Sequence, residues 1–317
     1  MAKYLVTGGA GFIGSNIVEQ LVGRGEEVRV LDNLCTGSED NLAPFRDSID
    51  FRKGDIRSEE DARSALQGID YVLHQAALRN VARSVEQPVE VNDVNVYGTL
   101  NLLLRAKEAG VKRVVYASSS SVYGDCDTFP EKETFTPDPI SPYAVSKLAA
   151  EHYCRMFSVT FGLETVSLRY FNVFGPRQNP ESKYSAVIPA FISRLEKDEP
   201  CQIHGDGNQS RDFTFVSNVV DANLAACGVP EASGRVFNVA CGCDFSVNQV
   251  AEELKKIMGK DIKSVHEPRR QGDVIRTFAD ISALKGVLGV EPGVDFHEGL
   301  KRTVEWFVGK KKVKGKS

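Results

Sequence analysis

The stretch TGGAGFIG, at residues 7–14, decides the fold of this chain. It follows a short apolar run and precedes an amphipathic one, so the pattern predicts a strand, a tight turn and a helix. Gly8 permits the turn, Gly11 lets the backbone approach a phosphate, and Gly14 lets helix and strand pack closely. The helix N-terminus then offers free N–H groups to a pyrophosphate, which predicts a dinucleotide site.

The second predicted strand identifies the dinucleotide. Residues 28–31 lead into Asp32, about 20 residues past the glycines, where a carboxylate accepts hydrogen bonds from the ribose hydroxyls of NAD. A solvated loop aspartate is the alternative interpretation of Asp32. Because a carboxylate would repel the 2′-phosphate of NADP, the sequence predicts NAD as the cofactor.

Length and composition are those of a globular enzyme. The 317 residues suffice for one large or two modest domains, and the net charge of −4 gives no reason to expect a nucleic-acid or membrane partner. No apolar run approaches the ~20 residues of a spanning helix. The first strand begins almost at once, so we expect no signal peptide.

The cysteine pattern predicts a reducing compartment. Seven scattered cysteines, an odd number, favour free thiols and a cytoplasmic protein. The run Cys241-Gly242-Cys243 is too tight and too solitary for a zinc site, which needs four ligands. We therefore expect no metal.

Short apolar runs alternate with helical patterns in the first half of the chain. Further buried strands are predicted at residues 51–54, 71–74, 114–117 and 165–168, with helices at 58–66, 94–109 and 142–161. This alternation predicts an α/β fold with a doubly wound parallel sheet, the Rossmann type.

The pattern becomes irregular after residue 175, where prolines and a Gly-Asp-Gly turn occur. We expect residues 1–175, with a later strand near 235–240, to form an NAD-binding Rossmann domain. Residues 176–309 would mainly form a smaller, interleaved substrate-binding lobe. Residues 310–317 would be a solvated basic tail.

A tyrosine and a lysine suited to catalysis lie in the helical pattern at 142–161. Tyr143 and Lys147 are four residues apart, so they share one face of a helix. A nearby ammonium favours the phenolate, as does the positive nicotinamide ring of NAD⁺. Tyr143 is therefore a candidate general base for a sugar hydroxyl, and an exposed helix pair is the alternative.

Four serines follow the predicted strand at 114–117. Ligands bind beyond the carboxyl ends of the strands in such sheets, and Ser118 to Ser121 occupy that place. Their hydroxyls can hydrogen-bond the reacting hydroxyl and the tyrosine. A turn-forming role is the alternative for two or three of the four.

Nine motifs in order resemble those of the extended short-chain dehydrogenases, specifically the nucleotide-sugar 4-epimerases. They are TGGAGFIG, DNL, GDIR, HQAA, SSSSVYG, SPYAVSK, LRYFNVFGPRQ, SRDF and PRRQGD. The similarity covers the chain from Lys3 to about Phe307 and looks strongest to UDP-N-acetylglucosamine/UDP-glucose 4-epimerases. It implies oxidation at C4 of a UDP-hexose to a 4-keto sugar by retained NAD, followed by re-reduction on the opposite face.

The resemblance also implies roles for individual residues. Tyr143 would take the proton of the 4-hydroxyl, Lys147 would hold the phenolate and the nicotinamide ribose, and Ser119 would polarise the substrate, with Ser120 and Ser121 as candidate helpers. The cofactor residues would be Gly8, Gly11, Phe12, Ile13 and Gly14 at the pyrophosphate, Asp32, Asn33, Thr36 and Gly37 at the adenosine, Asp55 and Ile56 at the adenine, and Gln75, Ala76, Ala77, Asn95 and Tyr170 toward the nicotinamide.

Further residues would hold the nucleotide sugar. Guanidinium groups bind phosphate oxygens in bidentate fashion, and surface ion pairs are the alternative role for such arginines. The resemblance places Asn172, Arg211 and Arg270 at the diphosphate, Val187 beneath the nucleotide, and Gln202 and Asp273 near the uracil or its ribose.

Two residues depart from the pattern of the family. Arg79 stands where relatives often carry a smaller residue or a lysine, and it could reach the diphosphate, favour an acidic sugar or cap its loop. Thr277 stands where strict UDP-glucose epimerases carry a tyrosine, which leaves room for an N-acetyl group. We therefore expect interconversion of UDP-GlcNAc with UDP-GalNAc and of UDP-Glc with UDP-Gal.

Three alternatives to this activity stay open. A UDP-glucuronate 4-epimerase would use Arg79. A 4,6-dehydratase or a decarboxylase would need acids where Ser120 and Ser121 stand. A non-catalytic scaffold would not need an intact Tyr143.

The same helices predict a homodimer. Their apolar residues could form a four-helix bundle with a second copy, and packing on the parent sheet is the alternative. These residues are Val96, Leu100, Leu103 and Leu104 in one helix, and Leu148, Tyr153 and Phe157 in the other.

Overall fold

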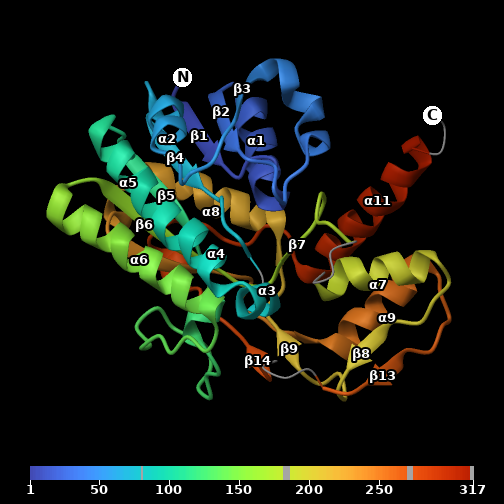
Figure 1. Ribbon diagram of the computed structural model, residues 1–317. Helices are drawn as coiled ribbons and strands as arrows, with labels where there is room; N and C mark the ends of the chain where they lie inside the picture. The colour runs from blue at the N-terminus through green and yellow to red at the C-terminus, as the bar shows by residue number, and fades with distance from the viewer. Residues whose placement is uncertain (80, 181–185, 270–273, 315–317) are drawn as a thin grey trace.

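A parallel sheet forms the centre of the computed structural model, which describes residues 1–79, 81–180, 186–269 and 274–314 (Figure 1). Within these residues its seven strands are, in spatial order, β11 (Arg235–Val239), β6 (Glu164–Tyr170), β5 (Arg113–Ser119), β4 (Tyr71–His74), β1 (Lys3–Thr7), β2 (Glu27–Asp32) and β3 (Ile49–Lys53). The chain order reverses between β1 and β4, and doubly wound sheets bind ligands at such a switch point. The predicted Rossmann architecture is confirmed.

Helices cover both faces of this sheet. On one face α1 (Phe12–Gly23) packs against α8 (Val216–Gly228), and on the other α2 (Glu59–Leu66), α5 (Gly98–Glu108) and α6 (Pro142–Phe161) lie side by side. Leu5 and Val6 are both fully buried, yet they belong to the apolar clusters of opposite faces. Alternate side chains of a strand point to opposite faces, so a strand covered on both sides is a continuous apolar run.

The helix α6 begins and ends where its sequence directs. The Ser141 hydroxyl accepts the Ala144 N–H at 3.2 Å, Pro142 is the first helical residue, and Gly162 ends the helix with φ 70°. The predicted helix at 94–109 starts differently, because Asp93–Tyr97 form a π-helical turn, η3, before α5. Asn95 lies in this turn and makes contacts described below.

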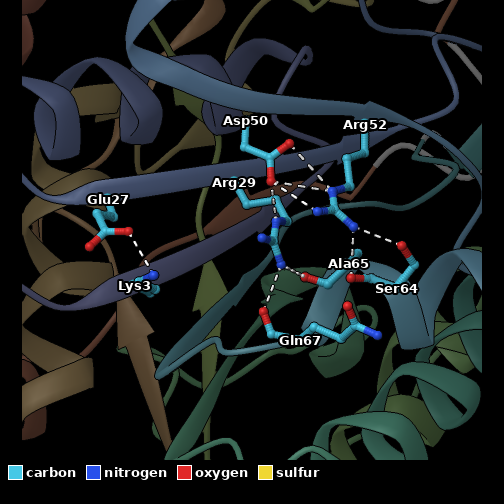
Figure 2. Close-up of polar contacts among 8 residues, drawn as sticks. All are labelled: Lys3, Glu27, Arg29, Asp50, Arg52, Ser64, Ala65 and Gln67. Carbon is cyan, nitrogen blue, oxygen red and sulfur yellow. Dashed lines mark hydrogen bonds and ion pairs between the residues drawn. The ribbon is translucent and has the colours of Figure 1, made fainter.

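Ion pairs join neighbouring strands near the edge of the sheet, and arginines of these pairs donate hydrogen bonds to α2, as Figure 2 shows. Arg29 and Asp50 face each other in register on β2 and β3, with Nε 2.6 Å from Oδ2. Arg52 pairs with the same carboxylate at 3.1 Å and donates to the Ser64 carbonyl at 2.8 Å. These groups are partly exposed, so each ion pair stabilises the fold by only about 0–1 kcal/mol.

A smaller lobe packs around α7 (Val187–Glu196), α9 (Val247–Met258) and α11 (Phe296–Lys314). Its short sheets pair β7 (Val173–Phe174) with β10 (Thr214–Phe215), β12 (Phe245–Ser246) with β9 (Ser210–Arg211) and β14 (Arg276–Thr277), and β13 (Val265–Glu267) with β8 (Gln202–His204). Since β11 and α8 return to the main sheet, the lobe is interleaved with it. The division at residue 175 stays a prediction.

Short helical segments connect these elements. They are η1 (Glu39–Asn41), η2 (Ala43–Ser48), α3 (Val81–Glu86), α4 (Pro88–Asn92), η4 (Ser120–Tyr123), η5 (Pro230–Ala232) and α10 (Ser282–Gly286). No helix in the described parts of the chain has both the length and the apolarity needed to cross a bilayer.

Candidate active site

A cavity opens at the carboxyl ends of the sheet strands, around the switch point. The described residues that line it are Gly8, Gly11, Phe12, Ile13, Gly14, Leu31, Asp32, Asn33, Cys35, Thr36, Gly54, Asp55, Ile56, Gln75, Ala76, Ala77, Leu78, Arg79, Val94, Ala117, Ser118, Tyr143, Lys147 and Tyr170. The structure therefore brings into one space most of the residues that the sequence assigns to the cofactor, and both members of the Tyr-Lys pair.

The glycine turn leaves no room for side chains. Gly8 has φ 67°, and a Cβ on Gly14 would lie 2.2 Å from the Gly8 carbonyl oxygen. α1 begins directly behind Gly11, and no side chain in the described residues caps it. Its first N–H groups are therefore available to an anion, which fits a pyrophosphate.

Asp32 ends β2 with its carboxylate oriented by the turn. Its Oδ2 accepts the Ala10 N–H at 2.9 Å and its Oδ1 accepts the Leu34 N–H at 2.8 Å. Burial raises the pKa of Asp32, and these two hydrogen bonds oppose the shift. Each oxygen can accept a further hydrogen bond, so the carboxylate fits the ribose hydroxyls of NAD.

A second carboxylate of the cavity, Asp55, is held by its neighbours. Asn33 Nδ2 donates to Asp55 Oδ2 at 2.9 Å, and Arg57 pairs with the same oxygen at 2.8 Å. The hydrogen bonds from Arg57 are the main cause that lowers the pKa of Asp55 to about 2. Asp55 is therefore ionised at neutral pH and fixed in orientation.

Tyr143 and Lys147 lie one turn apart on α6. Lys147 Nζ lies 5.9 Å from the centroid of the Tyr143 ring and donates to the Ala117 carbonyl at 2.8 Å. Burial lowers the pKa of Lys147 to about 7. Burial also raises the pKa of Tyr143, while a hydrogen bond with Ser119 and the charge of Arg79 act in the opposite direction.

The sequence led us to expect that Lys147 lowers the pKa of the tyrosine toward neutral. The net shift of the Tyr143 pKa is upward, because removal of the phenolate from water outweighs the hydrogen bond with Ser119 and the charge of Arg79. The positive nicotinamide ring of NAD⁺ would add a charge that acts in the downward direction.

The serine cluster divides into different roles. Ser119 ends β5, and its Oγ accepts hydrogen bonds from the Ser121 hydroxyl at 2.9 Å and the Ser121 N–H at 3.2 Å. Ser118 lines the cavity but donates to Glu151 Oε2 at 2.8 Å, within a buried ion pair of Glu151 with Arg169. Ser119 forms a hydrogen bond with Tyr143. The described cavity lining includes none of the three predicted catalytic serines Ser119, Ser120 and Ser121, and Ser120 begins the turn η4.

Sequence reasoning missed one polar residue beside the cavity. Asn223 of α8 donates to the Tyr170 hydroxyl at 2.7 Å and accepts from Gln75 Nε2 at 3.1 Å. Most of the other lining residues that the sequence did not predict are apolar or glycine. An apolar residue at a strand end has the same sequence pattern whether it lines a cavity or packs in the core.

Two of the cofactor predictions lie behind the cavity wall. Asn95 and Gly37 are absent from its described lining. The Asn95 amide instead bonds to both backbone groups of Leu78, at 2.8 and 3.0 Å, and so holds the loop that carries Ala76 and Ala77. Asn95 therefore contacts the loop behind the cavity lining and not the cavity itself.

Only some of the residues predicted to bind the substrate lie close to one another. Asn172 Nδ2 donates to Thr277 Oγ1 at 3.1 Å, and Thr277 is in register with Arg211 on the neighbouring strand. Arg211 donates to the Val274 carbonyl at 2.7 Å. Val187 begins α7, and Gln202 is an exposed residue of β8 that the described cavity lining does not include. Arg270 and Asp273 lie outside the described residues.

Comparisons with known proteins agree with this geometry. The model of the NAD dependent epimerase/dehydratase family matches residues 4–240. The UDP-glucose 4-epimerase of Mycolicibacterium smegmatis is 37% identical over 313 residues, which cover 97% of this chain and 99% of that protein.

Solved structures are similar over the whole chain. The UDP-N-acetylglucosamine 4-epimerase from Methanobrevibacter ruminantium M1, in complex with UDP-N-acetylmuramic acid, has a TM-score of 0.93 and 39% identity over 98% of this chain and 99% of its own. The UDP-glucose 4-epimerase of Thermus thermophilus, in complex with NAD, has a TM-score of 0.89 and 38% identity. The match covers 97% of this chain and 99% of that protein. The resemblance found in the motifs is confirmed, and the chain belongs to the NAD dependent epimerase/dehydratase family.

Proposed function

We propose that this chain is a UDP-hexose 4-epimerase that works with bound NAD. One observation carries the proposal: Tyr143 and Lys147 open onto the same cavity as the glycine turn and Asp32. A general base and a dinucleotide site that share one space are what oxidation of a substrate hydroxyl requires.

The side chains around Tyr143 have separate tasks in this reaction. Tyr143 takes the proton of the 4-hydroxyl and later returns it, and Ser119, fixed by Ser121, orients that hydroxyl. The bond from Lys147 Nζ to the Ala117 carbonyl holds this side chain beside the phenol. NAD, held by the glycine turn and Asp32, supplies the oxidation at C4 and its reversal.

The proposed substrates are UDP-GlcNAc and UDP-GalNAc together with UDP-Glc and UDP-Gal. Thr277 is the small side chain that we assign to the wall beside the 2-position of the sugar. Its hydrogen bond with Asn172 and its strand pairing with Arg211 support a place next to the diphosphate-binding side chains. A small residue there admits an N-acetyl group without excluding a hydroxyl.

Other reactions of such enzymes need groups that this cavity does not offer. A dehydratase or decarboxylase requires an acid that reaches the substrate, but Asp32 and Asp55 are the only carboxylates among the described lining residues. Both are on the side that we assign to the adenosine. Glu151 accepts from Ser118 but is held in its buried ion pair with Arg169, outside that lining. A UDP-glucuronate 4-epimerase stays a second candidate, because Arg79 lines the cavity and could meet a uronate.

We further propose a homodimer formed through η3, α5 and α6, in the cytoplasm. The sequence suggested Leu103 and Phe157 as interface residues, and that assignment is wrong. Both side chains are buried in the core of their own chain, with exposed fractions of 0% and 1%. Leu100, Leu104 and Tyr153 are only partly buried on the same helices. Sedimentation at micromolar concentration tests the dimer, and the mass of one chain would reject it.

The activity is tested with the purified protein and no added cofactor. Each UDP-sugar is incubated separately and its C4 epimers are separated. The bound nucleotide is identified after denaturation. We expect NAD in the protein and conversion of both sugar pairs. Release of NADP alone, or no epimerisation even with added NAD, would reject the proposal.

A further inference from the structure

Arg79 is a charged residue of the cavity that the mechanism above does not use. It follows β4 and lines the cavity together with Tyr143 and Lys147. Among the described residues no carboxylate pairs with its guanidinium. The side chain whose ionised form attracts the guanidinium is Tyr143, as a phenolate. A guanidinium stays protonated at every pH at which the protein is folded.

A buried clamp fixes the Arg79 loop against the helix that carries the tyrosine. The Asn95 amide accepts the Leu78 N–H at 2.8 Å and donates to the Leu78 carbonyl at 3.0 Å, directly before Arg79. The same amide donates to Ser146 Oγ at 3.0 Å, and Ser146 donates to the Tyr143 carbonyl at 2.7 Å. Asn95 is 1% exposed, so water does not compete for these bonds.

The other titratable groups around Tyr143 are weaker sources of positive charge. Lys147, on the same helix, has its pKa lowered to about 7 by burial, so near neutral pH it is charged only part of the time. Tyr116, on β5, is buried, and burial raises its pKa, which keeps it neutral. Arg79 is open to solvent through the cavity, although enough protein atoms surround it to lower its pKa.

We infer that Arg79 is a positioning residue for the general base: its permanent charge, fixed relative to Tyr143 by the Asn95 clamp, favours the phenolate that starts the reaction. The inference rests on the proposed function for its consequence in turnover. Its effect on the tyrosine itself does not depend on the identity of the sugar.

The direct test is a titration of Tyr143 in the holoenzyme. The ultraviolet absorbance of the phenolate is followed with pH, and the same protein carrying Tyr143→Phe is subtracted. Arg79→Gln should raise the pKa of Tyr143 by about 1 unit or more, because a nearby positive charge favours the phenolate and its loss favours the neutral phenol. Arg79→Lys keeps the charge and should give a smaller shift.

Arg63→Gln is the matched control for loss of one positive charge. Arg63 is 54% exposed on α2 and pairs with Glu59, outside the described cavity lining. This variant should leave the titration unchanged. An unshifted titration in a folded, NAD-loaded Arg79→Gln protein would overturn the inference, and so would an equal shift in Arg63→Gln.

Turnover separates this role from recognition of an acidic sugar. With UDP-glucose, Arg79→Gln should move the acidic limb of the kcat/KM profile upward by the same shift as the titration. If UDP-glucose kinetics stay unchanged and only the KM for UDP-glucuronate rises tenfold or more, Arg79 binds a substrate carboxylate and the inference is wrong. A protein that turns over no UDP-sugar but shows the titration shift would reject the proposed function and leave the inference standing.

Discussion

Replacing His74 by glutamine should remove one defined source of acid sensitivity from this fold. His74 ends β4 and is 1% exposed, and its ring nitrogens lie 2.6 Å from Thr7 Oγ1 and 2.9 Å from Thr99 Oγ1. Burial lowers the pKa of His74 from 6.5 to about 3, and the positive charge of Lys147 acts in the same direction. The folded protein therefore keeps this imidazole neutral over the whole range from pH 7.5 to 5.

The sign of the effect follows from proton uptake. Below pH 6.5 the unfolded chain binds a proton that the folded chain excludes, so the free energy of unfolding falls with pH until the folded form protonates near pH 3. With a pKa of 6.5 in the unfolded chain and about 3 in the folded chain, the free energy of unfolding falls by about 2 kcal/mol between pH 7.5 and pH 5. Glutamine has no proton to exclude, so the variant should not show this loss.

The variant is also less stable at every pH. It disturbs the two hydrogen bonds of the ring, which costs about 1–3 kcal/mol for buried partners. The measurement is therefore the difference between two pH values, not the stability at one of them. Urea unfolding is followed at pH 7.5 and pH 5 with the same excess of NAD.

The exposed residue His152, on α6, provides the matched control. His152→Gln should show the same change in stability between the two pH values as the wild type, and His74→Gln should be about 2 kcal/mol more favourable in that change. If His74→Gln declines in parallel with the wild type, the acid sensitivity arises elsewhere and our account of the buried ring is wrong.

Three further changes test the site itself. Tyr143→Phe should lower kcat by at least ~100-fold with the circular dichroism unchanged, because only the hydroxyl of the base is removed; near-normal turnover would move the base elsewhere. Gly14→Ala places a Cβ 2.2 Å from the Gly8 carbonyl oxygen and should empty the site of NAD, so full nucleotide content after purification would contradict the close packing. Thr277→Tyr should abolish turnover of UDP-GlcNAc and spare UDP-glucose, because added volume penalises the larger group. In the wild type, a tenfold kcat/KM preference for UDP-glucuronate, about 1.4 kcal/mol, would show that Thr277 is not the specificity gate.

The sequence predicted the sheet and one side of the site for physical reasons. Strands covered on both faces must be apolar at every position, as Leu5 and Val6 are, so their runs are recognisable without knowledge of partners. Parallel strands end at one edge of the sheet. Residues that end or directly follow strands, such as Asp32 and Gln75, could therefore be placed together in advance.

The rest of the site depends on contacts between segments far apart in the chain. Asn223 reaches Tyr170 across 53 positions and Gln75 across 148, and no local pattern marks such a partner. The helix faces show the same limit. Periodicity showed that Leu103 and Phe157 belong to apolar faces, but it could not show that their own core covers them completely.

One buried chain of hydrogen bonds connects the glycine turn to α6, the helix of the proposed base, and explains why the ring of His74 must be neutral. Thr99 donates to the Asn95 carbonyl at 2.7 Å, so its oxygen is free to accept from His74 Nε2–H. His74 Nδ1 then accepts from the Thr7 hydroxyl.

From Asn95 the chain continues through Ser146 to the Tyr143 carbonyl. A second proton on His74 would turn Nδ1 into a donor and leave the Thr7 hydroxyl proton without its acceptor. The position of the base relative to the glycine turn therefore depends on an imidazole that burial keeps neutral.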